Sequence, residues 1–194
     1  MLKVAVTGNI ASGKSAFEDI LKSKGFEVLD TDAVSHNLLK DETIKTEIKN
    51  VFCDFEIFEG SEISRPKLGK IVFNDDNLRK KLEGILHPGI MDEVRRFFRR
   101  KEEQGEKIAF ASVPLLFETG FEKFFDKIIL VYAADDIRLE RLVKRDNLSL
   151  EYAQNRLNLQ ISQNKKLSLA DYVLYNNKDF ESLRQEADKI VSLL

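Results

Sequence analysis

Short, nearly continuous apolar runs alternate with amphipathic segments near both ends of the chain. Two of these runs, Ile108–Val113 and Lys127–Tyr132, contain few polar residues. Such runs predict strands covered on both faces, as in a parallel sheet with helices on either side. The other runs are Leu2–Val6, Phe26–Leu29 and Tyr172–Tyr175. The pattern therefore predicts an α/β fold with a five-stranded parallel sheet and flanking helices.

Residues 42–105 show a different pattern, with apolar residues at helical spacing and no strand-like run. One apolar stripe ends at Leu86, directly before His87 and Pro88. Because a proline disfavours helical backbone in the residue before it, we expect His87 to be extended and a helix to end here. A further stripe follows and stops before Gly105. So long a helical stretch between two strands predicts a substrate-binding insertion.

The segment between the first strand and the first helix has the spacing Gly-x-x-x-x-Gly-Lys-Ser. Its glycines let backbone N–H groups converge on phosphate oxygens, and the helix N-terminus attracts the same anion. Lys14 can reach the β- and γ-phosphates of a nucleotide, and the Ser15 hydroxyl can bind Mg²⁺. The segment is therefore a candidate P-loop. Its predicted nucleotide-binding residues are Gly8, Asn9, Ile10, Ala11, Ser12, Gly13, Lys14, Ser15 and Ala16.

Asp32 lies where the second predicted strand becomes a helix. Aspartate often caps a helix N-terminus, which would be a purely structural role. However, the carboxyl edges of parallel strands form the ligand crevice, and the candidate P-loop lies on that edge too. We therefore expect Asp32 to have a functional role.

Arg138, Arg141 and Arg145 lie together on one side of a predicted helix late in the chain. Such a face is often simply solvated, here with local pairing to Glu140. Aligned arginines can also form a lid over phosphates, because guanidinium groups match phosphoryl oxygens. The residues alone leave both interpretations open.

Composition narrows the class of protein. The net charge of −2 argues against nucleic-acid or membrane-surface binding, which favours a basic surplus. No apolar run approaches the roughly 18 residues of a membrane span, and the first residues resemble a strand rather than a signal peptide. The single cysteine, Cys53, excludes an internal disulfide and is expected to pack as a small apolar residue. We expect a cytoplasmic protein, and no obligate protein partner is evident.

Several further motifs accompany the P-loop. They are Asp30-Thr31-Asp32, Arg65 before a leucine-bearing helix, Leu86-His87-Pro88, Pro-Leu-Leu-Phe-Glu at Pro114–Glu118, Arg-Leu-x-x-Arg at Arg141–Arg145, Arg-x-x-x-Gln at Arg156–Gln160, and Ala-Asp-Tyr-Val-x-x-Asn at Ala170–Asn176. In this order they resemble the dephospho-CoA kinase family over nearly the whole chain. Members of that family are P-loop, nucleoside-kinase-like enzymes that carry out the last step of coenzyme A biosynthesis.

The resemblance implies an activity and residue roles. ATP, with Mg²⁺ on Ser15, would phosphorylate the ribose 3′-hydroxyl of dephospho-CoA. Asp32 would accept or orient the proton of that hydroxyl. Lys14, Arg141 and Arg145 would act on the transferring phosphoryl group. Asn176 and Arg141 would contribute to the nucleotide site, and the implied substrate-binding residues are Asp32, Arg65, His87, Pro114, Leu115, Leu116, Phe117 and Glu118.

The resemblance also divides the chain. The single predicted domain, 1–194, would comprise a core (1–41, 106–136 and 167–194), a helical substrate region (42–105) and an arginine lid (137–166).

The chain departs from the usual residues of the family at several positions. Asn9 and Ala11 stand where glycine is usual, and they suit the loop if their φ angles are negative. Ala16 replaces a hydroxyl residue, Arg138 a glutamine, and Lys178 a glycine. The residues expected to do the chemistry are unchanged, so we expect the activity to be retained.

Two other functions share parts of this pattern. A nucleoside or nucleotide monophosphate kinase would have the same loop, aspartate and lid, and would differ in the helical region. A GTPase switch would need Asp-x-x-Gly and Asn-Lys-x-Asp. No glycine follows an aspartate by three residues, and Asn164-Lys165-Lys166 is followed by Leu167, so the sequence nearly excludes a GTPase.

Overall fold

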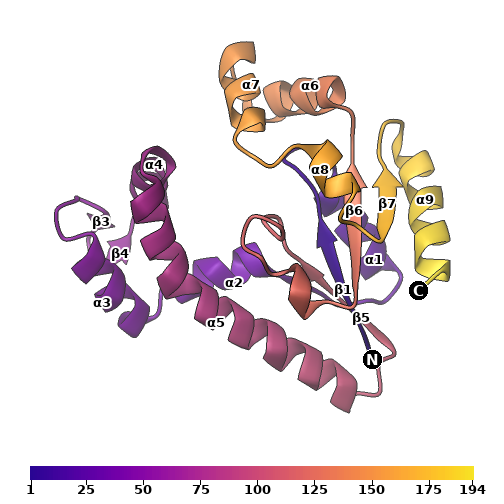
Figure 1. The fold of residues 1–194 in the computed structure, drawn as a ribbon, viewed down its shortest axis with the longest axis horizontal. Helices are drawn as coiled ribbons and strands as arrows, with labels where there is room; N and C mark the ends of the chain where they lie inside the picture. Colours follow the sequence, from indigo (N-terminus) through magenta and orange to yellow (C-terminus); the bar gives the residue numbers. More distant parts are fainter. The chain divides into compact units, whose positions relative to one another are not determined.

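A parallel sheet of five strands, in the order β2-β5-β1-β6-β7, forms the centre of the first of two units (Figure 1). The structure is a computed structural model that describes residues 1–194. The first unit comprises Met1–Asp30 and Arg100–Leu194. Its strands confirm the predicted α/β sheet; they are β1 (Leu2–Thr7), β2 (Val28–Asp30), β5 (Ile108–Ser112), β6 (Lys127–Tyr132) and β7 (Tyr172–Tyr175).

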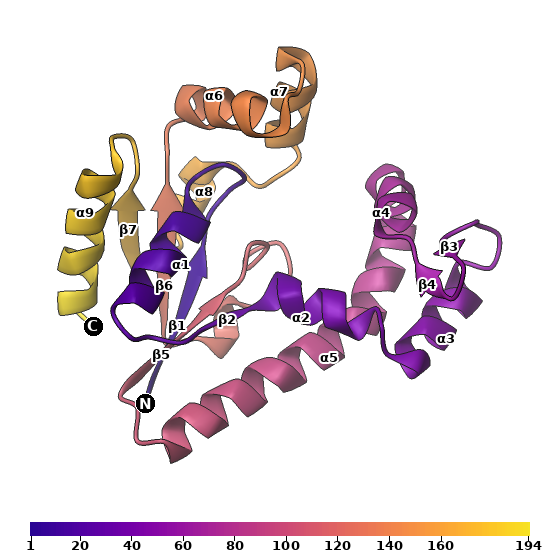
Figure 2. The ribbon, with the colours of Figure 1, turned by 180° about the vertical axis from the view of Figure 1, so that it is seen from behind.

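Helices cover both faces of this sheet. α1 (Lys14–Ser23) and α9 (Phe180–Ser192) lie on one face, and α8 (Gln163–Leu167) lies on the other (Figure 1 and Figure 2). α6 (Asp135–Asp146) and α7 (Leu150–Asn158) lie beyond the carboxyl ends of the strands (Figure 2). A short 3₁₀ turn, Glu122–Phe124, precedes β6.

The main core of the first unit lies between the sheet and helices α1 and α9. Phe17 and Leu21, four residues apart on α1, belong to one buried cluster with Phe110 of β5 and Ile129 of β6. The spacing places both α1 side chains on the same helix face, toward the sheet. Burying each such side chain contributes about 1.5–3 kcal/mol.

Parallel pairing brings the carboxyl ends of all the strands to one edge of the sheet. β1 is central: Val6 lies opposite Ser112 of β5, and Thr7 lies opposite Leu130 of β6. The segments that follow β1, β5, β6 and β7 therefore leave the sheet at the same edge. Open α/β sheets bind their ligands at this edge.

The second unit, Thr31–Arg99, is helical apart from one small hairpin. The hairpin was not predicted, because strands of two residues carry no periodic signal. Its elements are α2 (Thr31–Leu38), α3 (Glu42–Val51), β3 (Phe58–Glu59), β4 (Glu62–Ile63), α4 (Arg65–Asn74) and α5 (Asp76–Glu103), the last of which continues into the first unit.

The helix end expected at His87 is wrong. α5 runs through Pro88 as one helix, so His87 is helical rather than extended. A proline inside a helix costs about 3 kcal/mol, because it removes a hydrogen bond and crowds the preceding turn. Leu86, Ile90 and Val94, on both sides of Pro88, are buried. The burial of these side chains offsets the cost of the proline. A prediction from the local backbone preference of proline does not include this tertiary contribution.

The second strand begins two residues later than predicted. The expected span was Phe26–Leu29, whereas β2 spans Val28–Asp30. Phe26 instead packs edge-on against Phe110, with ring centroids 5.1 Å apart. Its backbone N–H donates to the carbonyl of Leu21 at the end of α1 at 3.1 Å, so Phe26 does not pair in the sheet.

Cys53 does not pack as a small apolar residue, which corrects the expectation. Its side chain is exposed, and the neighbouring Phe52 is buried in its place. Consecutive residues point in different directions in the turn after α3, so only one of the two reaches the interior.

None of the helices combines the length and apolarity required to cross a membrane.

We expect Phe110→Ala to lower the free energy of unfolding by about 3–5 kcal/mol, because it leaves a cavity in the main core. Phe110 is fully buried, whereas Phe180 is 61% exposed and serves as the matched control. Phe180→Ala should change the free energy of unfolding by less than about 0.5 kcal/mol. Urea denaturation followed by circular dichroism measures both, and equal losses would contradict the assignment of the core.

Candidate active site at the P-loop

The loop between β1 and α1 has an irregular backbone. Gly13 has φ 94° and Ala11 has φ 61°, both in the left-handed region. The condition of a negative φ, under which the two departures from glycine would suit the loop, is therefore met by Asn9 but not by Ala11. The N–H of Ser12 donates to the carbonyl of Asn9 at 3.0 Å, which closes a tight turn. Ala11 is the third residue of this turn, the position at which a type II turn requires a positive φ.

Two glycines are required by close contacts. A Cβ at Gly8 would lie 2.6 Å from Ser12 Oγ and 2.8 Å from the carbonyl oxygen of Val131. A Cβ at Gly13 would lie 1.9 Å from Asn176 Nδ2. The loop therefore packs against the ends of β6 and β7 without room for a side chain at either position.

The N-terminus of α1 is open to a ligand. No side chain caps this helix, so its first N–H groups have no intrahelical or capping partner. These groups and the helix dipole favour an anion at this position. Ser15, in the first turn, is exposed and can offer its hydroxyl oxygen to a cation.

Lys14 is held at the end of β5. Its Nζ lies 2.6 Å from Ser112 Oγ and 2.7 Å from Glu18 Oε1, and Ser112 donates to the same carboxylate. Glu18 is buried, so the pair keeps the ammonium at the carboxyl edge of the sheet. Neither Ser112 nor Glu18 was predicted as a site residue, although the four-residue spacing from Lys14 to Glu18 is a recognisable ion-pair signal.

Asn176, just beyond β7, supports the loop from one side. Its Nδ2 donates to the carbonyl of Ser12 at 2.8 Å, and its backbone N–H donates to Tyr132. The side chain is buried. The structure thus gives Asn176 a contact with the loop itself, and its direct contact with a nucleotide stays a prediction.

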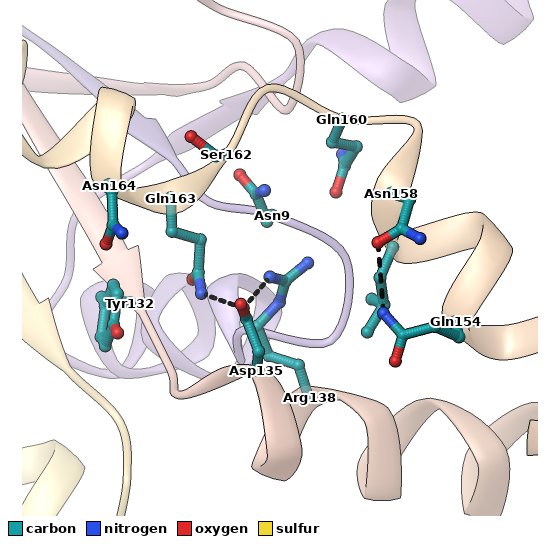
Figure 3. Close-up of a pocket in the computed structure, with 11 residues that line it drawn as sticks. Asn9, Tyr132, Asp135, Arg138, Gln154, Asn158, Gln160, Ser162, Gln163 and Asn164 are labelled. Atoms are coloured by element: carbon teal, nitrogen blue, oxygen red, sulfur yellow. Dashed lines mark hydrogen bonds and ion pairs between the residues drawn. The ribbon is translucent and has the colours of Figure 1, made fainter.

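Polar residues of α6, α7 and α8 surround a cavity of about 350 Å³ beside Asn9 (Figure 3). Arg138 lines this cavity and is only 3% exposed, so a fully solvated arginine face is the wrong interpretation for this residue. Its Nη1 donates to Asp135 at 2.8 Å. Burial lowers the pKa of Arg138, and the charge of Asp135 opposes that shift.

Arg141 and Arg145 differ in their surroundings. Arg141 Nη1 is buried without a hydrogen-bond partner. It lies 3.9 Å from the point where a Cβ on Gly13 would be, so this arginine lies against the P-loop. Arg145 instead donates to Asp146, which also accepts from Arg156. The hydrogen bond from Arg145 is the main cause that lowers the pKa of Asp146. Of the three aligned arginines, Arg138 and Arg141 lie against the P-loop, whereas Arg145 pairs with Asp146.

The Pro114–Glu118 segment follows β5 at the same edge. Thr7 Oγ1 donates to the carbonyl of Pro114 at 3.3 Å, and the side chain of Leu116 is fully buried. Glu118 Oε1 lies 2.7 Å from Nζ of Lys166, a lysine that is fully buried in α8. The segment is thus tied to the core at several points, and the substrate role of these residues stays a prediction.

The sequence matches the family model for dephospho-CoA kinase over residues 2–182. The chain belongs to the dephospho-CoA kinase family. It is 33% identical to a dephospho-CoA kinase from Fusobacterium nucleatum over 96% of this chain and 95% of that protein. A Campylobacter jejuni member is 34% identical, over 96% and 93% of the two chains.

Solved structures agree with this assignment. The crystal structure of TT1252 from Thermus thermophilus has a TM-score of 0.86 and 31% identity, and covers 100% of this chain and 97% of that one. The dephospho-CoA kinase from Campylobacter jejuni has a TM-score of 0.73 and 33% identity, with 98% and 95% coverage. Shikimate kinase from Bacteroides thetaiotaomicron shares only the fold, with a TM-score of 0.52 and 12% identity over 99% and 97% of the chains.

The remaining site residues predicted from the family resemblance lie in the second unit. Asp32 is exposed in the first turn of α2, directly after β2, so it lies inside the helix rather than at its cap. Arg65 is the exposed first residue of α4. His87 is half-buried in α5, where burial lowers its pKa and the charge of Glu83 acts in the opposite direction. Their roles in this family member stay predictions.

We expect Gly13→Ala to abolish measurable ATP binding, because the new Cβ would displace Asn176 and strain a left-handed backbone. Gly25→Ala is the matched control: Gly25 also has a positive φ, 89°, but its Cβ would meet nothing within 4 Å. The control should cost about 1 kcal/mol of stability and leave ATP affinity unchanged. Calorimetric titration with ATP tests both variants, and normal affinity in Gly13→Ala would contradict the loop geometry.

Proposed function

We propose that the protein transfers the γ-phosphoryl group of ATP to the ribose 3′-hydroxyl of dephospho-CoA, giving ADP and coenzyme A. The observation that supports this most strongly is membership of the dephospho-CoA kinase family over residues 2–182, with the P-loop intact. We further propose that the enzyme works in the cytoplasm.

Phosphate binding falls to the P-loop and α1. The open N-terminus of α1 and the backbone N–H groups of the loop suit the β- and γ-phosphates. The Lys14 ammonium lies at the carboxyl edge of the sheet, where the phosphates would bind. It would turn from Ser112 toward the phosphate oxygens. Ser15 would hold Mg²⁺, which neutralises the charge that develops on the phosphates. The exposed hydroxyl beside an anion site supports that assignment.

Asp32 is the proposed base. In the transfer, the 3′-oxygen forms a bond to the γ-phosphorus while the bond from that phosphorus to the β–γ bridging oxygen breaks. The hydroxyl proton passes to the Asp32 carboxylate, and ADP leaves with the bridging oxygen. A carboxylate that accepts this proton would also orient the hydroxyl group for attack on the γ-phosphorus.

Arg141 is the stronger candidate for stabilising the transferring group. Its unpartnered, buried Nη1 beside Gly13 supports a direct contact with phosphate. Arg145 would have to leave Asp146 to take part. On the acceptor side we propose Arg65, His87 and the Pro114–Glu118 segment as contacts for dephospho-CoA, on the strength of the family motifs.

An acceptor screen tests the proposed function. We expect ADP release in a coupled assay with dephospho-CoA, ATP and Mg²⁺, and at least about 100-fold lower kcat/KM with adenosine or nucleoside monophosphates. Mass spectrometry should show one added phosphate on the product. A preference for a nucleoside or nucleotide acceptor would overturn the proposal.

We expect Asp32→Asn to reduce kcat by about 10²–10⁴, because an amide cannot accept the hydroxyl proton. Asparagine has nearly the same volume, so the melting temperature and the dissociation constant for ATP should remain close to those of the wild type. Asp41→Asn is the matched control, since Asp41 caps α3 and has no proposed contact with substrate. Undiminished turnover in a folded, ATP-binding Asp32→Asn variant would show that Asp32 is not the base.

We expect Arg141→Ala to lower kcat more than it weakens ATP binding, because the guanidinium meets charge that peaks in the transition state. Arginines in this role contribute about 10³–10⁵ in rate. Lys144→Ala, on the exposed side of the same helix, should leave both quantities unchanged. If the two variants turn over equally, Arg141 does not act on the phosphoryl group.

A further inference from the structure

The P-loop is held from a second side by α6 and by the segment after α7. Arg138 Nε donates to the carbonyl of Ile10 at 2.9 Å, and the N–H of Ile10 donates to Gln160 Oε1 at 2.7 Å. Asn9 Nδ2 donates to the carbonyl of Ile161 at 2.9 Å. The first two of these hydrogen bonds, which we call the Ile10 clamp, satisfy both backbone groups of one residue at the tip of the loop.

We propose that Arg138 and Gln160 are positioning residues that fix the P-loop in its phosphate-binding shape. The role in ATP binding rests on the proposed function, whereas the restraint on the loop rests only on these contacts. Neither residue is among the nucleotide-binding positions that the sequence motifs predict.

The loop needs such a restraint because of Ala11. Its φ of 61° is unfavourable for a residue with a Cβ, and strained backbone of this kind persists only where the surroundings over-determine it. The Ile10 clamp fixes the residue before Ala11, and Asn176 fixes Ser12 after it through the carbonyl group. The strained residue is therefore tied on both sides.

The clamp itself is rigid on the side of Arg138. Asp135 Oδ1 accepts from Arg138 Nη1 and from Gln163 Nε2, each at 2.8 Å (Figure 3). Gln163 also donates to the carbonyl of Ala133 at 2.8 Å, which anchors the group to the end of β6. Arg138 Nη2 is buried without a hydrogen-bond partner, and turning the guanidinium away would leave Nε and Nη1 unsatisfied as well.

The clamp links the loop to the arginine that we expect to act on phosphate. Arg138 and Arg141 lie three residues apart on α6, so the helix that holds the Ile10 carbonyl also carries Arg141 against Gly13. A shift of α6 would thus move the loop and the arginine together. Loss of the clamp should therefore weaken ATP binding even though neither clamp residue needs to touch the nucleotide.

The cavity offers a matched control for Gln160. Gln154 lines the same cavity from α7, but its Nε2 donates to Asn158 Oδ1 and not to the loop (Figure 3). Gln160→Met and Gln154→Met replace the same amide by the same apolar side chain of similar length. Only the first removes the acceptor for the N–H of Ile10.

The test measures hydrogen–deuterium exchange of the peptide containing Ile10, ATP affinity and melting temperature on the full chain without acceptor. We expect Gln160→Met to raise the exchange rate at Ile10 and the dissociation constant for ATP by about three- to tenfold each, the effect of one lost hydrogen bond. The melting temperature should change by less than a few degrees. Gln154→Met should match the wild type in exchange at Ile10 and in ATP affinity.

A second variant, Arg138→Met, removes the other half of the clamp and should give the same loop-specific change. Asp135 is left with Gln163 as a donor and is 79% exposed, so its charge stays solvated. Wild-type exchange at Ile10 in both variants, or equal changes in Gln154→Met, would overturn the proposal. If the loop and ATP affinity respond as expected but dephospho-CoA is not phosphorylated, the proposed function fails and the clamp stands.

Discussion

The parallel pairing of β1 between β5 and β6 is the constraint on which the rest of the first unit depends. Parallel strands end at the same edge, so this pairing brings the P-loop and Ser112 together, and the pairing of β7 with β6 adds Asn176 from a distant part of the sequence. The pairing is possible because the strands are apolar on both sides and can be covered by helices on both faces. The hydrogen bonds of Ser112 to Lys14 and Glu18, residues one turn apart on α1, depend on this pairing.

The shape of the P-loop depends on contacts from other segments as well as on its own glycines. A loop with glycine at every strained position could adopt this backbone without penalty, but here Ala11 occupies a left-handed position. Support comes from Asn176 on one side and from the Ile10 clamp on the other. The hydrogen bonds of Arg138 and Gln163 to Asp135 therefore stabilise the loop that the family motifs assign to phosphate binding.

Much of the fold and of the phosphate site could be predicted from the sequence. Buried parallel strands are continuous apolar runs, so β6 was predicted with its observed bounds, and the apolar run of the partly exposed edge strand β7 gave its bounds as well. The P-loop is a local motif in which spacing and neighbouring elements carry the signal, which is why Lys14 and Ser15 were recognised. The order of the later motifs was specific enough to indicate the family, which the comparisons confirm.

The tertiary structure decided what depends on contacts between segments distant in sequence. Helix α5 continues through Pro88 because buried neighbours outweigh the local preference of proline. The φ of Ala11, the burial of Arg138 and the hydrogen bond from Ile10 to Gln160 each require a partner more than 100 residues away or a turn closed by packing. The sequence by itself determined the strands and the phosphate-binding motif, because both are written in local periodicity and spacing. Which polar side chains support that motif was decided only by the folded chain, since hydrogen-bond geometry has no local pattern.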